Sequence, residues 1–542
     1  MLNESSWTPL QRARREYKPT LPALLCKGRS LQFVNEQKPL IGPPPQEMQQ
    51  AFPITAKHNV LRAEAGSKSP NAHPLKIAVL FSGGEAPGGH NVLVGLLDAL
   101  QEIHPQSRLF GFLNGSEGLL SGQSKHLLRE EITLVRNQGG FELIGSGRKK
   151  IETKAEFVQA LRGVQELDLD GLVIVGGDDS NTNAAMLAEY FSKEKCKTCV
   201  IGVPKTIDGD VKNPYVATPF GFDTACKVYS ELIGNLAKDA LTTRKYTHFI
   251  RLMGRSASHI ALECALSTQP NCTLIGEEVA AANKTLKQIG EEVTQLVMKR
   301  GEAGKNYGVI LIPEGLVEFI PEMKLLIEEL NRLVAEQSTI SVTEVLPQLS
   351  KKSASCYSAL PKTIQEELLL NRDSHGNVHV SSIETELLLI ELVRMNVASR
   401  QKKFQGNFTP MHHFFGYEGR GSYPSNFDCN YCTALGKAAA HMIDQRLSGY
   451  LCAIHDLAQA PTEWQLFAIP LPRLMHRELR KGKMTSVVRK TLVDLSGSAF
   501  QNFQAKRANW SIEDHYLFPG PMQFYGDPCL TDCGPRSISL SR

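Results

Sequence analysis

The sequence has no long apolar run. A stretch of about 18 apolar residues, enough to cross a membrane as a helix, occurs nowhere in the 542 residues. The segment from Met1 to Arg29 also lacks the apolar core that follows a basic head in a secretory signal. We therefore expect a cytosolic protein with no membrane association.

Cysteine is scarce too. The 12 cysteines are scattered along the chain, unlike the dense disulfide framework of small secreted domains. Three closely spaced pairs leave a structural zinc as an alternative to ordinary reduced thiols. These pairs are Cys196/Cys199, Cys429/Cys432 and Cys529/Cys533. The gap between the first two pairs is longer than in compact zinc sites, which favours thiols.

The chain also lacks a strong charge of either sign. A net charge of +4 is too weak a bias to predict nucleic acid or a membrane surface as a partner. Hydrophobic residues at 42% and charged residues at 21% are typical of a folded globular protein. Because 542 residues exceed what one hydrophobic core usually supports, we expect two or three lobes.

Short apolar segments alternate with helical ones from Lys76 onward. Six of them end at glycine, proline or polar clusters, as buried parallel strands do: 76–81, 171–177, 198–204, 247–253, 272–278 and 307–315. Segments 91–103, 183–193 and 283–299 suit crossover helices. The pattern predicts an α/β fold with two Rossmann-like lobes and mostly parallel sheets.

Other segments differ in composition. Residues 1–74 are rich in proline and polar residues, which predicts an irregular N-terminal extension. Residues 317–404 are helical and charged, which predicts a helical insertion with its own small core, acting either as a lid or as a packing or dimer contact. We place the first α/β lobe at 75–240, the second at 241–316 and 405–500, and a C-terminal packing segment at 501–542.

The first candidate site is the glycine-rich turn Ser82–Gly89, which follows the first strand and opens a helix. Bare N–H groups and the positive helix end can hold an anion such as phosphate there. The turn lacks the Lys-Ser/Thr ending of a P-loop and the Gly-x-Gly-x-x-Gly spacing of a dinucleotide fold. An ordinary tight turn is the alternative.

Carboxylates follow the next two predicted strands, where ligands of such sheets bind. Asp178 and Asp179 come after 171–177, and one of them can hold a hard cation such as Mg²⁺ beside phosphate. Asp208 and Asp210 come after 198–204, with Lys205 upstream. Phosphoryl transfer needs a base for the acceptor's proton and cations for the phosphate oxygens. Solvated loop residues are the alternative.

Further polar residues have similar positions after strands or glycine turns. The fork of arginine suits phosphate, and Glu314 can accept hydrogen bonds from sugar hydroxyls. Ordinary surface charges are the alternative. The cations in question are Arg148, Arg244, Lys245, Arg255 and Arg420.

Six motifs occur in one order across residues 81–420. They are FSGGEAPGGHNV, GGDDSNTNAA, PKTIDGD, RKYTHFIRLMGR, IPEG and HFFGYEGR. This set resembles the phosphofructokinase family, in its long pyrophosphate-dependent branch. The likeness continues at YPSNFDCNYCTALG, residues 423–436.

The resemblance implies a reaction and a set of roles. It implies reversible transfer of a phosphoryl group from pyrophosphate to the 1-hydroxyl of fructose 6-phosphate, in glycolysis and gluconeogenesis, with Mg²⁺ held by Asp178. Asp208 is the implied general base and Asp210 orients cations nearby, whereas Gly83, Arg148 and Lys205 meet the donor. The implied sugar-phosphate residues are Thr206, Ile207, Asp208, Met253, Gly254, Arg255, Glu314, Tyr417, Glu418, Gly419 and Arg420, with Lys245 and Tyr246 lent by a neighbouring subunit. That sharing implies an active homodimer.

The resemblance ties the choice of donor to Asp179 and Lys205. ATP-using relatives carry glycine at both positions, which leaves room for the nucleotide's α-phosphate. A carboxylate at position 179 obstructs ATP by bulk and charge, and the Lys205 ammonium stabilises the leaving phosphate. Glu85 and Lys149 depart from the family pattern without removing a catalytic group.

Three alternatives remain. An ATP-dependent phosphofructokinase is disfavoured by Asp179 and Lys205. A non-catalytic regulatory partner is disfavoured because Asp178, Lys205, Asp208 and Arg255 are retained. NAD kinases and lipid kinases share a GGD-type strand end but lack TIDGD and YEGR.

Overall fold

The computed structural model describes residues 7–26, 30–66, 73–336, 342–370, 378, 383–480 and 483–541. The chain divides into two compact units, each assembled from three separate stretches of sequence. Unit 1 comprises Met1–Ala225, Tyr417–Thr491 and Gln523–Gly534. Unit 2 comprises Cys226–Gly416, Leu492–Met522 and Pro535–Arg542.

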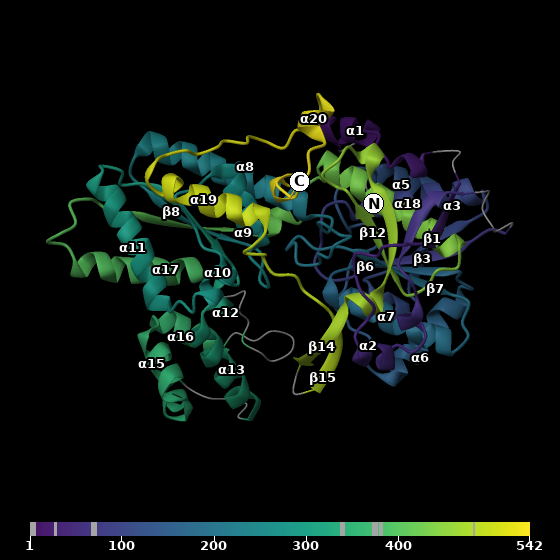
Figure 1. Ribbon diagram of the computed structural model, residues 1–542, viewed down its shortest axis with the longest axis horizontal. Coiled ribbons are helices and arrows are strands. Elements are labelled where there is room, and N and C mark those ends of the chain that lie inside the picture. The colour runs from purple at the N-terminus through teal and green to yellow at the C-terminus, as the bar shows by residue number, and fades with distance from the viewer. Residues whose placement is uncertain are drawn as a thin grey trace. The chain divides into compact units, whose positions relative to one another are not determined.

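Unit 1 is built on a nine-stranded sheet with the order β1-β2-β13-β12-β7-β6-β3-β4-β5. Strands β1, β3, β6, β7 and β12 of this sheet are labelled in Figure 1. The pairs from β12 to β4 are parallel, and the pairs toward both edges are antiparallel. The strands are β1 (Leu31–Asn35), β2 (Leu61–Ala65), β3 (Lys76–Phe81), β4 (Arg108–Phe112), β5 (Ser124–His126), β6 (Gly171–Gly176), β7 (Cys199–Pro204), β12 (Tyr450–His455) and β13 (Gln465–Pro470). A separate hairpin pairs β14 (Met475–Arg480) with β15 (Lys483–Val488).

Helices accompany this sheet. Every residue of β6 and β7 is buried, as expected of parallel strands covered on both faces. The helices of unit 1 are α1 (Pro9–Glu16), α2 (Gln46–Ala51), α3 (Gly89–Ile103), α4 (Ser116–Ser121), α5 (Arg129–Val135), α6 (Lys154–Glu166), α7 (Asp178–Lys193), α18 (Asn426–Asp444) and α20 (Pro528–Thr531). Helix α7 begins earlier than predicted, directly at the two aspartates.

The N-terminal extension is less irregular than predicted. Strands β1 and β2 form one edge of the sheet, and β2 pairs with β13. The fully buried Arg14 of α1 donates to Asn426 Oδ1 and to the carbonyl of Pro424, both at 2.6 Å. Its guanidinium also lies 4.2 Å from the ring centroid of Phe524. The extension is therefore an integral part of unit 1.

Unit 2 has a four-stranded parallel sheet with the order β11-β8-β10-β9. Its strands are β8 (Thr247–Leu252), β9 (Cys272–Thr273), β10 (Gly308–Pro313) and β11 (Pro410–Phe415). Its helices are α9 (His259–Thr268), α10 (Gly276–Ala281), α11 (Leu286–Glu302), α12 (Leu316–Phe319), α13 (Pro321–Glu336), α14 (Val342–Val345), α15 (Lys351–Ala359), α16 (Lys362–Leu370), α17 (Thr385–Ser399), α19 (Ser498–Ile512) and α21 (Arg536–Ser539). Helix α8 (Phe222–Thr243) begins in unit 1 and continues into unit 2.

The helical insertion does not have a core of its own. Met323 and Leu330 of α13 belong to the same buried cluster as Ile310 and Ile312 of β10. The insertion therefore extends the core of the unit 2 sheet. This packing is the physical reason why the prediction of a separate small core was wrong.

Two predicted boundaries also differ from the structure. The predicted strand at 272–278 is only Cys272–Thr273, because α10 begins at Gly276. Residues 417–491 were predicted to lie with the second lobe but belong to unit 1, because β12 pairs with β7 and β13 with β2.

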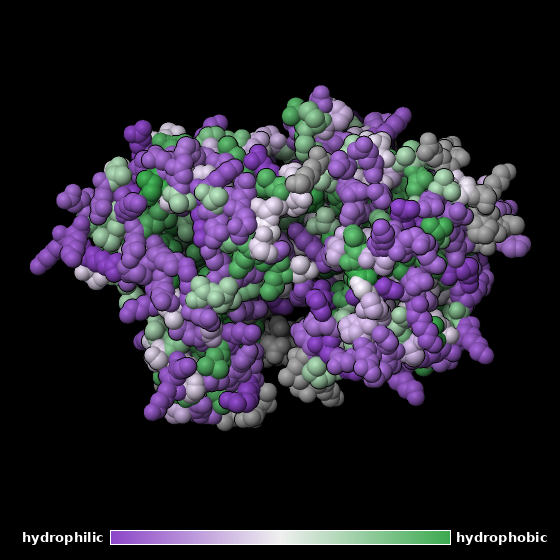
Figure 2. Space-filling view, in the orientation of Figure 1, coloured by the Kyte–Doolittle hydropathy of each residue, from purple (hydrophilic) through white to green (hydrophobic). Residues whose placement is uncertain are grey.

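Among the residues described, no helix is both long and apolar enough to cross a membrane. Hydrophilic residues predominate on the face seen in Figure 2, in both units.

Gly95→Ala should destabilise unit 1. A Cβ at Gly95 would lie 2.2 Å from the carbonyl oxygen of Thr433 on α18, and backbone cannot move aside cheaply. Overpacking of this kind costs about 1–3 kcal/mol, so the thermal midpoint should fall. Gly290→Ala on α11 is the control, because its nearest neighbour is the Leu392 side chain at 3.2 Å. Equal midpoints for the two variants would contradict the close α3–α18 packing.

Candidate active site

The glycine turn after β3 lies beside two cations. Gly83 has a φ of 88°, and its N–H donates to the carbonyl of Gly147 at 2.9 Å. A Cβ at Gly83 would lie 3.2 Å from Lys205 Nζ, and one at Gly84 would lie 2.7 Å from Arg420 Nη1. The bare backbone therefore leaves room for an anion where two positive groups converge.

Lys205 follows β7 and is buried, with 4% of its surface exposed. Its ammonium donates to the carbonyl of Gly84 at 2.8 Å. Burial lowers the pKa of Lys205 to about 7, the Arg420 and Arg148 guanidiniums act in the same direction, and Asp208 opposes them. The structure thus brings Lys205 and these two arginines together around the glycine turn.

Four carboxylates lie at the same edge of the sheet. Asp178 and Asp179 are the first two residues of α7, where the helix dipole favours negative charge. Asp210 is buried, and burial together with the nearby Asp208 and Asp178 carboxylates raises its pKa to about 7, against the effect of Lys490. Asp178, Asp208 and Asp210, which follow β6 and β7, therefore form one electrostatic cluster.

This cluster fits a divalent cation that shares its coordination with substrate oxygens. The buried Oδ1 of Asp208 has no hydrogen-bond partner among the described residues. The same described residues contain no group of three or more His, Cys, Asp or Glu side chains arranged to hold a metal. Mg²⁺ needs no such cage, because it commonly takes one or two carboxylates and fills its remaining sites with water and phosphate.

The sequence analysis did not identify two lysines that lie beside these aspartates. Lys490 Nζ lies 3.6 Å from Asp178 Oδ2, and Lys150 Nζ lies 2.9 Å from Asp179 Oδ2. Lys490 follows β15, more than 300 residues after its partner Asp178, and no motif marks it. For Lys150 the run GSGRKK offered a signal, but its neighbour Lys149 pairs with Glu156 instead.

The YEGR segment begins the stretch Tyr417–Thr491 of unit 1. The predicted lobe boundaries had placed this segment in the second lobe. Arg420 Nη1 donates to the carbonyl of Glu85 at 3.2 Å, so the guanidinium faces the glycine turn. Tyr417 and Glu418 are exposed, and Gly419 is buried. Burial, with Glu142 nearby, raises the pKa of Glu85.

The TID segment links Lys205 to the aspartates. The N–H of Asp208 donates to Thr206 Oγ1 at 3.0 Å, which closes a tight turn. Ile207 is fully buried, so its side chain packs in the interior. Any contact that this position makes with a ligand would therefore come from its backbone.

Unit 2 holds the remaining candidates. The N–H of Gly254 donates to Glu314 Oε2 at 3.0 Å, and that of Met253 donates to the carbonyl of Phe415 at 3.1 Å. Any side chain at Gly315 would strike the carbonyl of Arg255, because a Cβ there would lie 1.8 Å away. These contacts join the ends of β8, β10 and β11.

Three cationic or aromatic side chains of unit 2 are accessible. Arg255 and Lys245 are exposed and Tyr246 is partly exposed. Lys245 Nζ lies 5.3 Å from the ring centroid of Tyr246. Lys245 and Tyr246 precede β8, at the opposite strand end from Met253 and Gly254.

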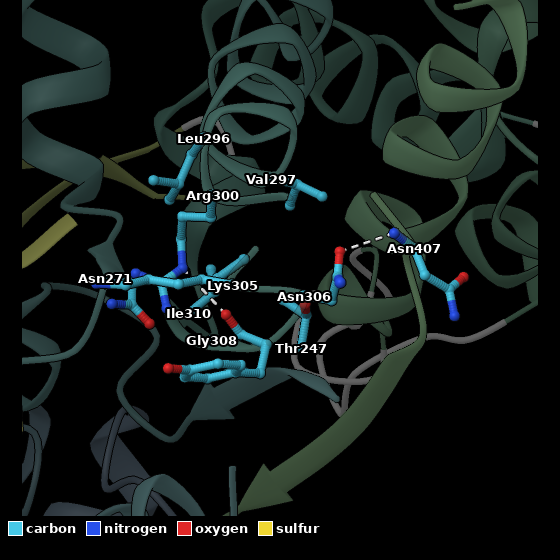
Figure 3. Close-up of a pocket in the computed structure, with 11 residues that line it drawn as sticks. Thr247, Asn271, Leu296, Val297, Arg300, Lys305, Asn306, Gly308, Ile310 and Asn407 are labelled. Atoms are coloured by element: carbon cyan, nitrogen blue, oxygen red, sulfur yellow. Dashed lines mark hydrogen bonds between the residues drawn. The ribbon is translucent and has the colours of Figure 1, made fainter. Parts of the chain in front are cut away.

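A small cavity of unit 2 is shown in Figure 3. It is lined by Arg300, Lys305 and Asn271 among others, and its volume is about 10 Å³. That volume holds about one water molecule. The cavity is therefore too small for a sugar phosphate.

Comparison with known proteins gives a consistent set of matches. The sequence profile described as Phosphofructokinase matches residues 76–443. A "Pyrophosphate--fructose 6-phosphate 1-phosphotransferase" of Treponema pallidum is 48% identical, covering 88% of this chain and 85% of its own length. One of that name from Porphyromonas gingivalis is 43% identical, with 98% of both chains covered.

Plant relatives and solved structures match as well. Subunit beta 2 of the "Pyrophosphate--fructose 6-phosphate 1-phosphotransferase" of Arabidopsis thaliana is 45% identical over 96% of this chain and 92% of its own. The structure of a pyrophosphate-dependent phosphofructokinase from Nitrosospira multiformis superposes with a TM-score of 0.55 at 16% identity, covering 84% of this chain and 96% of that one. The structural match shows a common fold.

Lys205→Met should raise the thermal midpoint of the ligand-free protein. The pKa of Lys205 in the folded state, about 7, lies below its ordinary value. The charged lysine therefore opposes folding in full below about pH 7, and this penalty shrinks as the pH rises toward the unfolded-state pKa of about 10.4. Calorimetry should accordingly show a larger gain at about pH 6.5 than at about pH 9.5.

Lys154→Met, at an exposed lysine at the start of α6, is the matched control and should give no pH-dependent gain. A gain for Lys205→Met that is equal at both pH values would contradict a buried ammonium at this position.

Proposed function

The chain belongs to the phosphofructokinase family, and we propose that it transfers a phosphoryl group reversibly from inorganic pyrophosphate to the 1-hydroxyl of fructose 6-phosphate. The products are fructose 1,6-bisphosphate and phosphate. The observation that carries this proposal is the buried Lys205 ammonium, which lies between the glycine turn and the aspartates of the TIDGD segment. The full-length relatives named for the same reaction support it.

The donor site is formed by backbone and cations of unit 1. The glycine turn at Gly83 and Gly84 leaves space for the donor, and the side chains of Lys205 and Arg148 bind the oxygens of pyrophosphate. Charge-assisted hydrogen bonds of this kind are about twice as strong as neutral ones. Lys205 also stabilises the phosphate that leaves when the bridging P–O bond breaks.

Asp179 selects against a nucleotide donor. Its carboxylate pairs with Lys150 at 2.9 Å, which fixes it at the first turn of α7. A fixed negative charge there repels the α-phosphate of ATP and occupies its space. Specificity then comes from a repulsive group as much as from an attractive one.

Asp208 acts as the general base. It accepts the proton of the sugar 1-hydroxyl as the oxygen forms its new bond to phosphorus. Its Oδ1, buried and without a hydrogen-bond partner among the described residues, is available for that proton. Asp210 lies beside it and orients cations nearby.

Mg²⁺ bound at Asp178 would neutralise the charge that develops on the transferred phosphoryl group. Lys490, which lies 3.6 Å from Asp178 Oδ2, holds this carboxylate in place before the substrates bind.

The remaining candidate residues would bind fructose 6-phosphate. The side chains of Thr206 and Asp208 and the backbone of Ile207 contact the reacting end of the sugar. Arginine forks suit the 6-phosphate, and Glu314 accepts from sugar hydroxyls. The other members of this set are Met253, Gly254, Arg255, Tyr417, Glu418, Gly419 and Arg420.

Lys245 and Tyr246 would complete the sugar site of a second copy, so we propose a homodimer with shared active sites that works in the cytosol. The accessible surface of Lys245 and its position at the start of β8, away from Met253 and Gly254, support this assignment.

Replacing both donor-selecting residues should change the donor. In the Asp179→Gly/Lys205→Gly double variant, pyrophosphate loses a charge-assisted contact, so kcat/KM for pyrophosphate should fall about 10- to 100-fold. ATP should become a measurable donor, because the obstructing carboxylate is gone. Assays with the two donors in parallel, at fixed Mg²⁺ and fructose 6-phosphate, measure both effects.

The single variants serve as controls for the double variant. Asp179→Gly should admit ATP and keep most pyrophosphate activity, whereas Lys205→Gly should lose pyrophosphate activity without gaining ATP. Full pyrophosphate activity in the double variant would refute the donor assignment. No turnover by the unmodified purified chain would refute the proposed reaction.

Asp208→Asn should remove the base but keep the shape of the site. We expect kcat to fall by about 10²–10⁴-fold, with KM for both substrates changed much less. Asp168→Asn, at an exposed aspartate before β6, should keep the original kcat. Steady-state kinetics in both reaction directions test this role, and an unchanged kcat for Asp208→Asn would rule it out.

A further inference from the structure

Unit 1 contains a cavity of about 720 Å³ that shares no residue with the donor site. Its walls come from residues 40–45 of the N-terminal extension, 211–217 after the TIDGD segment, 473–475 before the β14–β15 hairpin, and 488–491 after it. We call it the extension pocket. Its volume falls within the range of about 300–1,000 Å³ that is usual for small-molecule sites.

The charges that line the extension pocket have one sign. Lys212, Arg473 and Arg489 line it, and none of its lining residues is acidic. Three cations in one pocket raise the local concentration of anions. The charge of the pocket therefore favours a negatively charged ligand.

Arg473 is held in place by the extension. Its guanidinium donates to the carbonyls of Ile41 and Gly42, both at 3.3 Å, and of His58, at 3.2 Å. Its Nε is buried and has no hydrogen-bond partner among the described residues. These carbonyl contacts hold the guanidinium in one position, so an anion that meets it does not have to order a flexible side chain.

Most of the remaining wall is apolar. Val211, Val216, Leu474 and Val488 line the pocket, together with three prolines from the extension and the 211–217 segment. Such a wall gives no favourable contact to pyrophosphate or to a sugar phosphate, which have no apolar part. It stabilises a ligand in proportion to the apolar area that the ligand buries, by about 25 cal/mol per Å².

The extension pocket is joined to the catalytic loop by backbone contacts. The N–H of Thr491 donates to the carbonyl of Asp210 at 2.8 Å, and its hydroxyl donates to the carbonyl of Lys212 at 2.8 Å. Thr491 and Lys212 both line the pocket. A ligand that orders these residues therefore also orders the segment that carries Asp208 and Asp210.

We propose that the extension pocket binds an organic anion in which one phosphate, carboxylate or sulfonate group is attached to an apolar body, and that its occupancy changes the rate of phosphoryl transfer. The anionic group lies against Arg473 and Arg489, and the apolar body lies against the valines and prolines. The binding step is independent of the proposed reaction. The proposed change in rate rests on the proposed reaction.

The binding test uses 8-anilinonaphthalene-1-sulfonate, a fluorescent arylsulfonate, titrated into the full-length protein without substrates. Arg489→Glu reverses one lining charge at an exposed side chain, so we expect the variant to keep its fold. We expect this variant to weaken binding about tenfold. Arg162→Glu makes the same charge change at an exposed position of α6 and should leave the affinity unchanged.

Three results would overturn the proposed binding site. They are equal affinity in the original protein and Arg489→Glu, equal weakening by Arg162→Glu, and displacement of the probe by saturating pyrophosphate with Mg²⁺. Probe binding that persists at saturating pyrophosphate is the expected result, because the two sites share no residue.

The coupling is tested by turnover at saturating probe. We expect the KM for pyrophosphate or kcat to change at least twofold in the original protein, and not in Arg489→Glu at the same probe concentration. An unaltered rate in the original protein, with the probe bound, would overturn the coupling. Binding is measured without turnover, so failure of the proposed reaction is distinguishable from failure of the pocket.

Discussion

A buried ammonium held against a backbone carbonyl is the constraint on which the site depends. Lys205 has 4% of its surface exposed, and its contact with the Gly84 carbonyl brings the end of β7 against the turn after β3. A side chain at Gly83 or Gly84 would displace Lys205 or Arg420, because these side chains occupy the adjacent space. Burying a charge with so few partners is unfavourable for folding, and an anionic substrate removes that penalty when it binds.

Two carboxylates of the site have a lysine partner before any ligand arrives. Asp178 lies near Lys490, and Asp179 pairs with Lys150. A donor that enters the site therefore exchanges protein ion pairs for new ones, and its net affinity is a difference between large opposing terms. Such a site discriminates strongly by charge and geometry and only weakly by contact area.

The sequence predicted the parts of the fold and of the candidate site that follow from local pattern. The buried runs at 171–177 and 198–204 are strands, and the polar residues after them meet because carboxyl ends of parallel strands share one edge of the sheet. The contact of Lys490 with Asp178 and the assignment of Arg420 to unit 1 could not be predicted in this way. Sequence periodicity does not indicate contacts between residues hundreds of positions apart. The length of strand β9 was overestimated because the apolar run 272–278 continues into α10. A short apolar run does not distinguish a strand from a helix.

The pairing of β2 with β13 has a consequence for how the chain folds during translation. Strand β2 ends at Ala65, and its partner β13 begins at Gln465, with unit 2 encoded almost entirely between them. At about 5–20 residues per second, translation needs tens of seconds to deliver that partner. During this interval β2 exposes an unpaired edge, a known template for aggregation.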